Sequence, residues 1–87
     1  MSKRQKKARD RQLYAEAVAE IIEACRRHPG LRTVIHRHFC RLAGREVVRQ
    51  AVGQWLDEDP KTRVEPKWGT GQVLLAAWAE ARKEIGE

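Results

Sequence analysis

The sequence predicts an all-α fold: a small four-helix domain that contains a helix-turn-helix and carries a basic N-terminal arm. Its 87 residues are enough for one small domain. Apolar residues recur at three- and four-residue steps, as they do on one face of a helix. The chain has only three prolines and is rich in Ala, Leu, Glu, Arg and Gln, which favour helices.

The positive charge is concentrated in two segments. Residues 1–11 hold six Lys or Arg side chains against Asp10, and we expect them to form a flexible arm ahead of a helical domain over residues 12–87. Residues 26–49 hold seven arginines against Glu46. Clustered basic side chains of this kind are typical of a surface that binds phosphates.

The first helix is expected from about residue 10 to 28. Pro29 and Gly30 should end it, because proline cannot continue the helical hydrogen bonds and glycine suits a left-handed turn. A second helix should follow and end near Ala43-Gly44, and its expected apolar stripe is Leu31, Val34, Ile35, His38, Phe39 and Leu42. The expected apolar face of the first helix consists of Leu13, Tyr14, Ala17, Val18, Ile21, Ile22 and Cys25.

The third helix has a distinct polar face. In REVVRQAVGQWL, residues 45–56, the apolar side is expected to be Val48, Val52, Trp55 and Leu56. The opposite side carries Arg49, Gln50, Gly53 and Gln54. Arg and Gln have the hydrogen-bonding groups that match guanine and adenine edges in the major groove. A glycine inside a helix costs about 1 kcal/mol relative to alanine, which suggests a close approach to another surface.

The remainder of the chain is expected to be a connection and a last helix. Residues 57–71 are rich in Pro, Gly and Asp, with one short extended piece at residues 62–65. The last helix should run from about Thr70 to Ile85, with Thr70 as its N-cap.

Membrane, secreted and enzyme classes are not favoured. The longest apolar run, residues 73–79, is too short to cross a bilayer, and no apolar stretch follows the basic N-terminus as a secretory signal requires. We therefore expect a cytoplasmic protein with reduced cysteines. The chain has no nucleophile elbow and no glycine-rich phosphate loop, so we expect no enzyme and no cofactor.

The histidines and cysteines lie close together in the sequence. Cys25, His28, His36 and Cys40 are residue types that bind zinc, and His36 and Cys40 share a helix face. The seven residues between the two pairs are few for a zinc finger, and both cysteines fit apolar positions. Buried thiols and a core-facing histidine are the interpretation that we favour over a metal site.

The segment FCRLAGREVVRQAVGQWL, residues 39–56, resembles the helix-turn-helix of phage repressor and Cro-type regulators. The later Arg63-Val64-Glu65-Pro66 is similar to a sequence that follows the motif in that family, so the resemblance covers about 35 of the 87 residues. It implies a DNA-binding transcriptional regulator whose recognition helix, residues 47–56, lies in the major groove of double-stranded DNA.

The resemblance also implies roles for individual residues. Base edges would be contacted by Arg49, Gln50, Gly53 and Gln54, and phosphates by Arg41, Arg45, Lys3, Arg4, Lys6 and Lys7. Such regulators usually bind as homodimers, for which Trp68, Trp78 and the last helix are candidate surfaces. No membrane partner is implied.

The turn between the two motif helices allows two interpretations. If the turn is two residues longer than usual, Gly44 lies in the turn and all apolar positions agree with the family. If there is no insertion, Leu42 and Glu46 replace a small residue and a glycine. We favour the longer turn.

Two other functions fit parts of the sequence. A small basic adaptor or inhibitor would place the Arg-rich surface on an acidic protein partner. Non-specific packaging or RNA binding would also use the charge, but the chain has one Tyr and one Phe where stacked aromatics would be expected.

Overall fold

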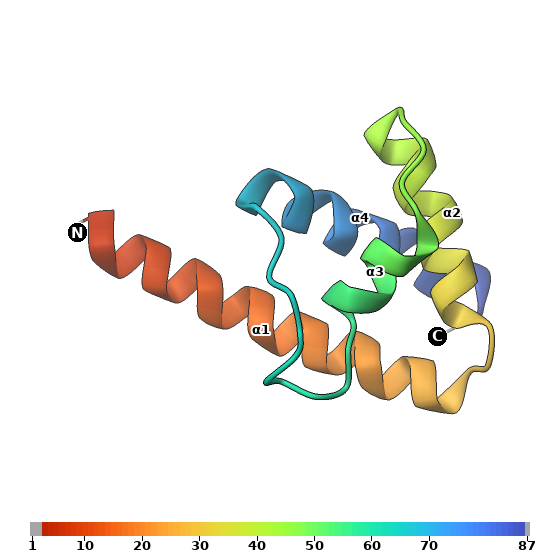
Figure 1. Cartoon of the computed structure of the whole chain (residues 1–87), viewed down its shortest axis with the longest axis horizontal. Coiled ribbons are helices and arrows are strands. Elements are labelled where there is room, and N and C mark those ends of the chain that lie inside the picture. Colours follow the sequence, from red (N-terminus) through yellow and green to blue (C-terminus); the bar gives the residue numbers. More distant parts are fainter. Residues whose placement is uncertain (1–2, 87) are drawn as a thin grey trace.

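Four helices make up the protein (Figure 1), in a computed structural model that describes the backbone of residues 3–86 and the side chains of residues 11–86. Within those residues no strand is present, so the predicted all-α class is confirmed. No helix among them combines the length and the apolar character that spanning a membrane requires. In chain order the helices are α1 (Lys3–Arg27), α2 (Leu31–Ala43), α3 (Arg49–Trp55) and α4 (Trp68–Glu84).

Helix α1 begins earlier than the sequence predicts, at Lys3 and not near residue 10. The expected start was set by the first apolar residue, Leu13, but that side chain is itself 53% exposed. Lys, Arg, Gln and Ala sustain a helix without apolar contacts. The first part of α1 therefore projects past the other helices (Figure 1). Lys3, Arg4, Lys6 and Lys7 belong to this part, and their side chains lie outside the described ones.

The core lies between α2 and α4, which pack most closely on each other, and it is closed by α1 from Tyr14 onward. Phe39 and Ile35 of α2 and Leu74 of α4 belong to one buried cluster, and each of the three side chains is at most 1% exposed. Every buried side chain of the described residues is apolar or aromatic. The buried set is Tyr14, Val18, Ile21, Ile22, Ala24, Leu31, Ile35, Phe39, Val52, Leu56, Leu74, Ala77, Trp78 and Ala81.

Two glycines set the limits of α2, as the sequence predicts. Gly30 has a φ of 87° and Gly44 a φ of 69°, and both lie in the left-handed region that favours glycine. The amide of Gly44 donates to the carbonyls of Cys40 and Arg41 at 3.1 and 3.3 Å. These bonds satisfy carbonyls at the end of α2 and reverse the chain toward α3.

The starts of the last two helices differ from the prediction. Helix α3 begins at Arg49, because Val48 is extended (φ −64°, ψ 141°) and is the N-cap. Val48 is also 70% exposed, so its predicted place on the buried face of the helix is wrong. Helix α4 begins at Trp68 with Lys67 as N-cap, which excludes Thr70 from the capping role.

The connection between α3 and α4 is irregular throughout, and the predicted extended piece at residues 62–65 does not form a strand. Instead the amides of Thr62 and Arg63 both donate to the carbonyl of Asp59, at 3.2 and 3.0 Å, which makes a turn. The amide of Val64 then donates to the carbonyl of Gln54 at 3.0 Å. This last bond ties the returning chain to α3.

Gly71 marks a close approach between α4 and α1. A Cβ at this position would lie 3.0 Å from Cε2 of the buried Tyr14, whereas a Cβ at Gly69 would have no neighbour within 4 Å. We expect Gly71→Ala to lower the free energy of unfolding by about 1–3 kcal/mol through overpacking. Gly69→Ala, the matched control, should leave it unchanged or raise it slightly. Urea unfolding measures both, and equal midpoints for the two variants would contradict the close contact.

The pKa of Tyr14 should show whether this side of α1 is buried in the folded protein. Burial raises the pKa of Tyr14 to about 12, and the negative charge of Glu65 acts in the same direction. The unfolded chain releases its phenolic proton nearer pH 10, so the free energy of unfolding should fall as the pH rises from about 10 to 12. Because the chain has a single tyrosine, its phenolate absorbance gives the pKa directly. A midpoint near 10 in the folded protein would show that Tyr14 is exposed.

Candidate nucleic-acid interface

Helix α3 is attached to the core through one side. Val52 and Leu56, four residues apart, are 1% and 0% exposed. Between them Trp55 is half-buried and lies against Phe39 of α2, with the ring centroids 5.2 Å apart and the planes tilted by 53°. Arg32 of α2 donates to the carbonyl of Leu56 at 3.2 Å and secures the end of the helix. The predicted anchoring roles of Val52, Trp55 and Leu56 agree with this arrangement.

The other side of α3 presents the four residues that the sequence predicts to contact bases. Arg49, Gln50 and Gln54 are exposed and Gly53 is half-buried. Their spacing places Gln50 and Gln54 opposite Val52 and Leu56, while Arg49 and Gly53 lie between that face and the buried one. The Arg49 side chain rests on α2, where its Nη2 donates to Thr33 Oγ1 at 2.8 Å.

Gly53 has no structural partner that would require a glycine. A Cβ built there has no heavy atom within 4 Å, and its φ is not positive. One side of Gly53 borders a shallow, open depression of about 460 Å³, whose other lining residues are Arg32, Asp57 and Glu58. The fold therefore gives no reason for this glycine, although a glycine within a helix lowers its stability.

The turn between α2 and α3 contains Gly44, as the interpretation with the longer turn expects. Five residues, 44–48, separate the helices, and Gly44 takes the left-handed conformation at the end of α2. Val47 packs on the core while Val48 points outward. The expected recognition helix, residues 47–56, corresponds in the structure to α3 and its flanking residues, with the helix itself at Arg49–Trp55.

His36 and Cys40 hold this turn through the backbone of Val47. The amide of Val47 donates to Cys40 Sγ at 3.4 Å, and Cys40 Sγ lies 3.7 Å from the carbonyl of Val47. His36 Nε2 makes a short contact with the same carbonyl and lies 3.5 Å from Cys40 Sγ. The spacing of these two residues, four apart on one helix, was visible in the sequence. Their part in the turn was not, because Val47 reaches them only through the fold.

The four residues weighed as zinc ligands are not gathered into one group. In the described part of the chain there is no group of three or more His, Cys, Asp or Glu residues that could hold a metal ion. Cys25 is a free, half-buried thiol on α1, and its pKa is raised by burial. His36 Nε2 and Cys40 Sγ lie 3.5 Å apart, and both side chains engage Val47.

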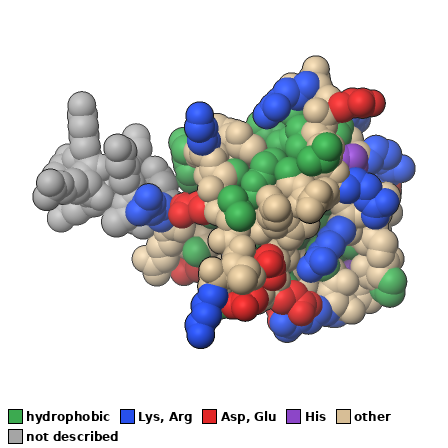
Figure 2. All heavy atoms as spheres, viewed as in Figure 1, with side chains coloured by type: hydrophobic (Ala, Val, Ile, Leu, Met, Phe, Trp, Pro, Cys, Tyr) green, Lys and Arg blue, Asp and Glu red, His purple; other side chains and the backbone are tan. Residues whose placement is uncertain are grey.

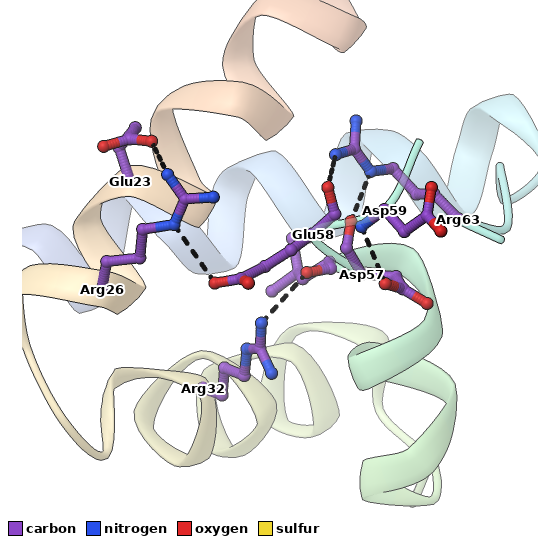
Figure 3. Close-up of polar contacts among 8 residues, drawn as sticks. Glu23, Arg26, Arg32, Asp57, Glu58, Asp59 and Arg63 are labelled. Atoms are coloured by element: carbon purple, nitrogen blue, oxygen red, sulfur yellow. Dashed lines mark hydrogen bonds and ion pairs between the residues drawn. The ribbon is translucent and has the colours of Figure 1, made fainter. Parts of the chain in front are cut away.

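The two ends of α3 differ in charge. Beside its first turn, Arg45 and Arg49 are exposed, and Arg41 of α2 is exposed with its Nη2 3.1 Å from His38 Nδ1. Beyond its last turn lie Asp57, Glu58 and Asp59 (Figure 3). In the space-filling view acidic side chains gather below α3 (Figure 2). Phosphates would be attracted to the first end and repelled from the second.

The acidic end is ordered by its own hydrogen bonds (Figure 3). The amide of Asp59 and the hydroxyl of Thr62 donate to the Asp57 carboxylate at 2.9 and 2.8 Å, and the first of these does most to lower the pKa of Asp57. Arg63 donates to the carbonyl of Asp57 at 2.7 Å. Arg26 Nε lies 3.2 Å from Glu58 Oε1. The basic side chains drawn here are thus occupied by acidic or carbonyl groups of the protein.

The two tryptophans proposed for a dimer surface differ in exposure. Trp78 is 5% exposed and belongs to the core, with the Arg82 guanidinium 5.6 Å from its ring, so its proposed role in a dimer surface is wrong. Trp68, at the start of α4, is 48% exposed. Hydrophobic side chains gather over α4 and the α2–α3 turn in the view of Figure 2.

Comparison with protein-family models, curated proteins and solved structures finds no match for this chain. The resemblance of residues 39–56 to phage repressor and Cro-type motifs stays an expectation drawn from the sequence.

Cys40 should control the order of the turn. Cys40→Ala removes the acceptor of the Val47 amide, and we expect that amide to exchange its hydrogen about fivefold faster, as the loss of a bond of about 1 kcal/mol implies. Hydrogen exchange followed by NMR resolves this amide. Arg37→Ala, a change on the same helix at an exposed residue that pairs with Glu84, should leave it unchanged. Equal exchange in the two variants would contradict the role of Cys40.

Proposed function

We propose that the protein is a sequence-specific, double-stranded DNA-binding regulator of transcription, with α3 lying in the major groove. The carrying observation is the division of α3 into two sides. Val52 and Leu56 fix the helix to the core, while Gln50 and Gln54 are exposed on the opposite side and Arg49 is exposed between the two, beside Thr33 of α2. Arg and Gln side chains on a rigid helix are suited to bonding with guanine and adenine edges.

Gly53 supports the same proposal independently. The space beside it is open, so the fold alone does not require a residue without a Cβ. In the groove, a glycine between Gln50 and Gln54 lets the backbone of α3 come closer to the bases. A partner surface thus offers an explanation for a residue that is otherwise unfavourable in a helix.

The charges favour one orientation of α3 on the duplex. Its first turn, near Arg45 and Arg41, would enter the groove, with these arginines on the flanking phosphates. The carboxylates of residues 57–59 would then lie at the outer end of the helix, away from the phosphates. The basic residues of α1, from Lys3 to Arg11, would add contacts to the DNA backbone outside the groove.

A homodimer and a cytoplasmic location belong to the same proposal. Regulators of this kind read two half-sites through two copies, whose spacing follows the helical repeat of DNA. Trp68 supports α4 as the contact between copies, because it is a large apolar side chain left about half exposed. A palindromic site recovered from random DNA would support two-fold symmetry.

A second candidate function is a protein-binding adaptor that acts on an acidic partner. The observation that favours it is that two large apolar side chains, Leu42 near the end of α2 and Trp68 at the start of α4, are 44% and 48% exposed. A pull-down from nuclease-treated host extract separates the two functions. A partner retained after all nucleic acid is removed, together with no sequence preference on DNA, would favour the adaptor.

The decisive test is selection from random duplex DNA, followed by binding measurements on the selected site. We expect Arg49→Ala and Gln50→Ala each to lower discrimination against mismatched sites by about 1–3 kcal/mol. Arg45→Ala should weaken all sequences alike and reduce the salt slope by about one. Fluorescence anisotropy on matched and scrambled duplexes measures both effects. If the selection returns no preferred sequence, operator recognition is wrong.

Two further variants serve as controls in this experiment. Lys83→Ala removes an exposed charge on α4 and should change neither discrimination nor affinity beyond a small salt effect. Gly53→Ala should raise the free energy of unfolding by up to about 1 kcal/mol and weaken DNA binding. A gain in stability together with a loss of affinity separates damage to the interface from damage to the fold.

A further inference from the structure

Val48 is exposed to an extent that its chemistry does not favour. Among the large hydrophobic side chains of the described residues it has the highest exposed fraction, 70%, followed by Leu13 at 53% and Trp68 at 48%. Its neighbour Val47 packs against the core, so the two valines point in opposite directions. Since the core does not use Val48, its apolar side chain is available to a partner.

The position of Val48 is fixed by the backbone on both sides. Before it, Val47 is held by His36 and Cys40. After it, the carbonyl of Val48 accepts from the amide of Ala51 at 3.0 Å and starts α3. Val48 therefore has a fixed position relative to Arg49 and Gln50. It lies at the end of α3 that would enter the groove in the proposed orientation.

The major groove offers an apolar group to which such a side chain is suited. Each A·T pair presents the C5-methyl of thymine there, beside the hydrogen-bonding groups that the other positions read. The Val48 side chain has no donor or acceptor and would leave a polar base edge unpaired. Contact with a thymine methyl matches its chemistry and avoids that cost.

We propose that Val48 is a specificity-determining residue that packs against the C5-methyl of a thymine next to the base pairs read by Arg49 and Gln50. This inference rests on the proposed function. Removing one buried methyl contact is expected to weaken binding about fourfold, from the free energy of burying one carbon group.

The test removes the methyl group from the DNA and the side chain from the protein separately. Each thymine of the selected duplex is replaced in turn by deoxyuridine, which lacks only the methyl. Wild-type protein should lose about fourfold in affinity at one thymine position of each half-site. Val48→Ala should bind the thymine and deoxyuridine duplexes equally at that position. Because Val48 makes no side-chain cap bond and is exposed, the variant should fold normally.

Leu13→Ala is the matched control, since it removes a second exposed apolar side chain from a different helix. It should retain the wild-type preference for thymine over deoxyuridine. If Val48→Ala also retains that preference, or if the wild type is indifferent to every replacement, the inference is overturned while a selected sequence still supports the proposed function. If no sequence is selected, the proposed function is wrong, and the inference about Val48 is wrong with it.

Discussion

The whole arrangement depends on the burial of Val52 and Leu56, because α3 is too short to be stable without the core. A helix of seven residues has only a few internal hydrogen bonds and cannot repay the cost of its nucleation in water. Its stability comes from the two buried side chains, from the contact of Trp55 with Phe39 and from the bond of Arg32 to its last carbonyl. The same contacts orient the exposed face. Any function of that face is thus coupled to the packing of α2 on α4.

Much of the fold could be predicted from the sequence, because the local signals agreed with the tertiary structure. The stripe of apolar residues in α2 and its two flanking glycines predict its limits correctly. Where apolar periodicity alone placed the start of a helix, the prediction was wrong: α1 starts at Lys3, where only helix propensity acts, and Val48 precedes α3. The residue type alone does not distinguish Trp78 from Trp68. The packing of α4 buries Trp78 and leaves Trp68 about half exposed.

The sequence was sufficient to name the candidate interface residues on α3. It did not show which contacts hold the turn that precedes this helix. Arg49, Gln50, Gly53 and Gln54 follow from a helical period of 3.6 and a short anchored helix. The hold of His36 and Cys40 on Val47 depends on a backbone contact across the turn, which no spacing rule contains. A metal site was weighed for the same side chains because His and Cys are common zinc ligands. Their residue types alone do not show that both contact the backbone of Val47.

Because α3 has a buried side and an exposed side, its exposed residues can be changed with little effect on the stability of the fold. Changes at exposed positions that lack structural partners usually alter the free energy of unfolding by less than about 0.5 kcal/mol, whereas loss of a buried apolar side chain costs several times more. Gln50 and Gln54 can therefore vary while Val52 and Leu56 stay fixed. A library randomised at these two glutamines should consist mainly of folded proteins with different surfaces, which makes this small domain a practical scaffold for altered recognition.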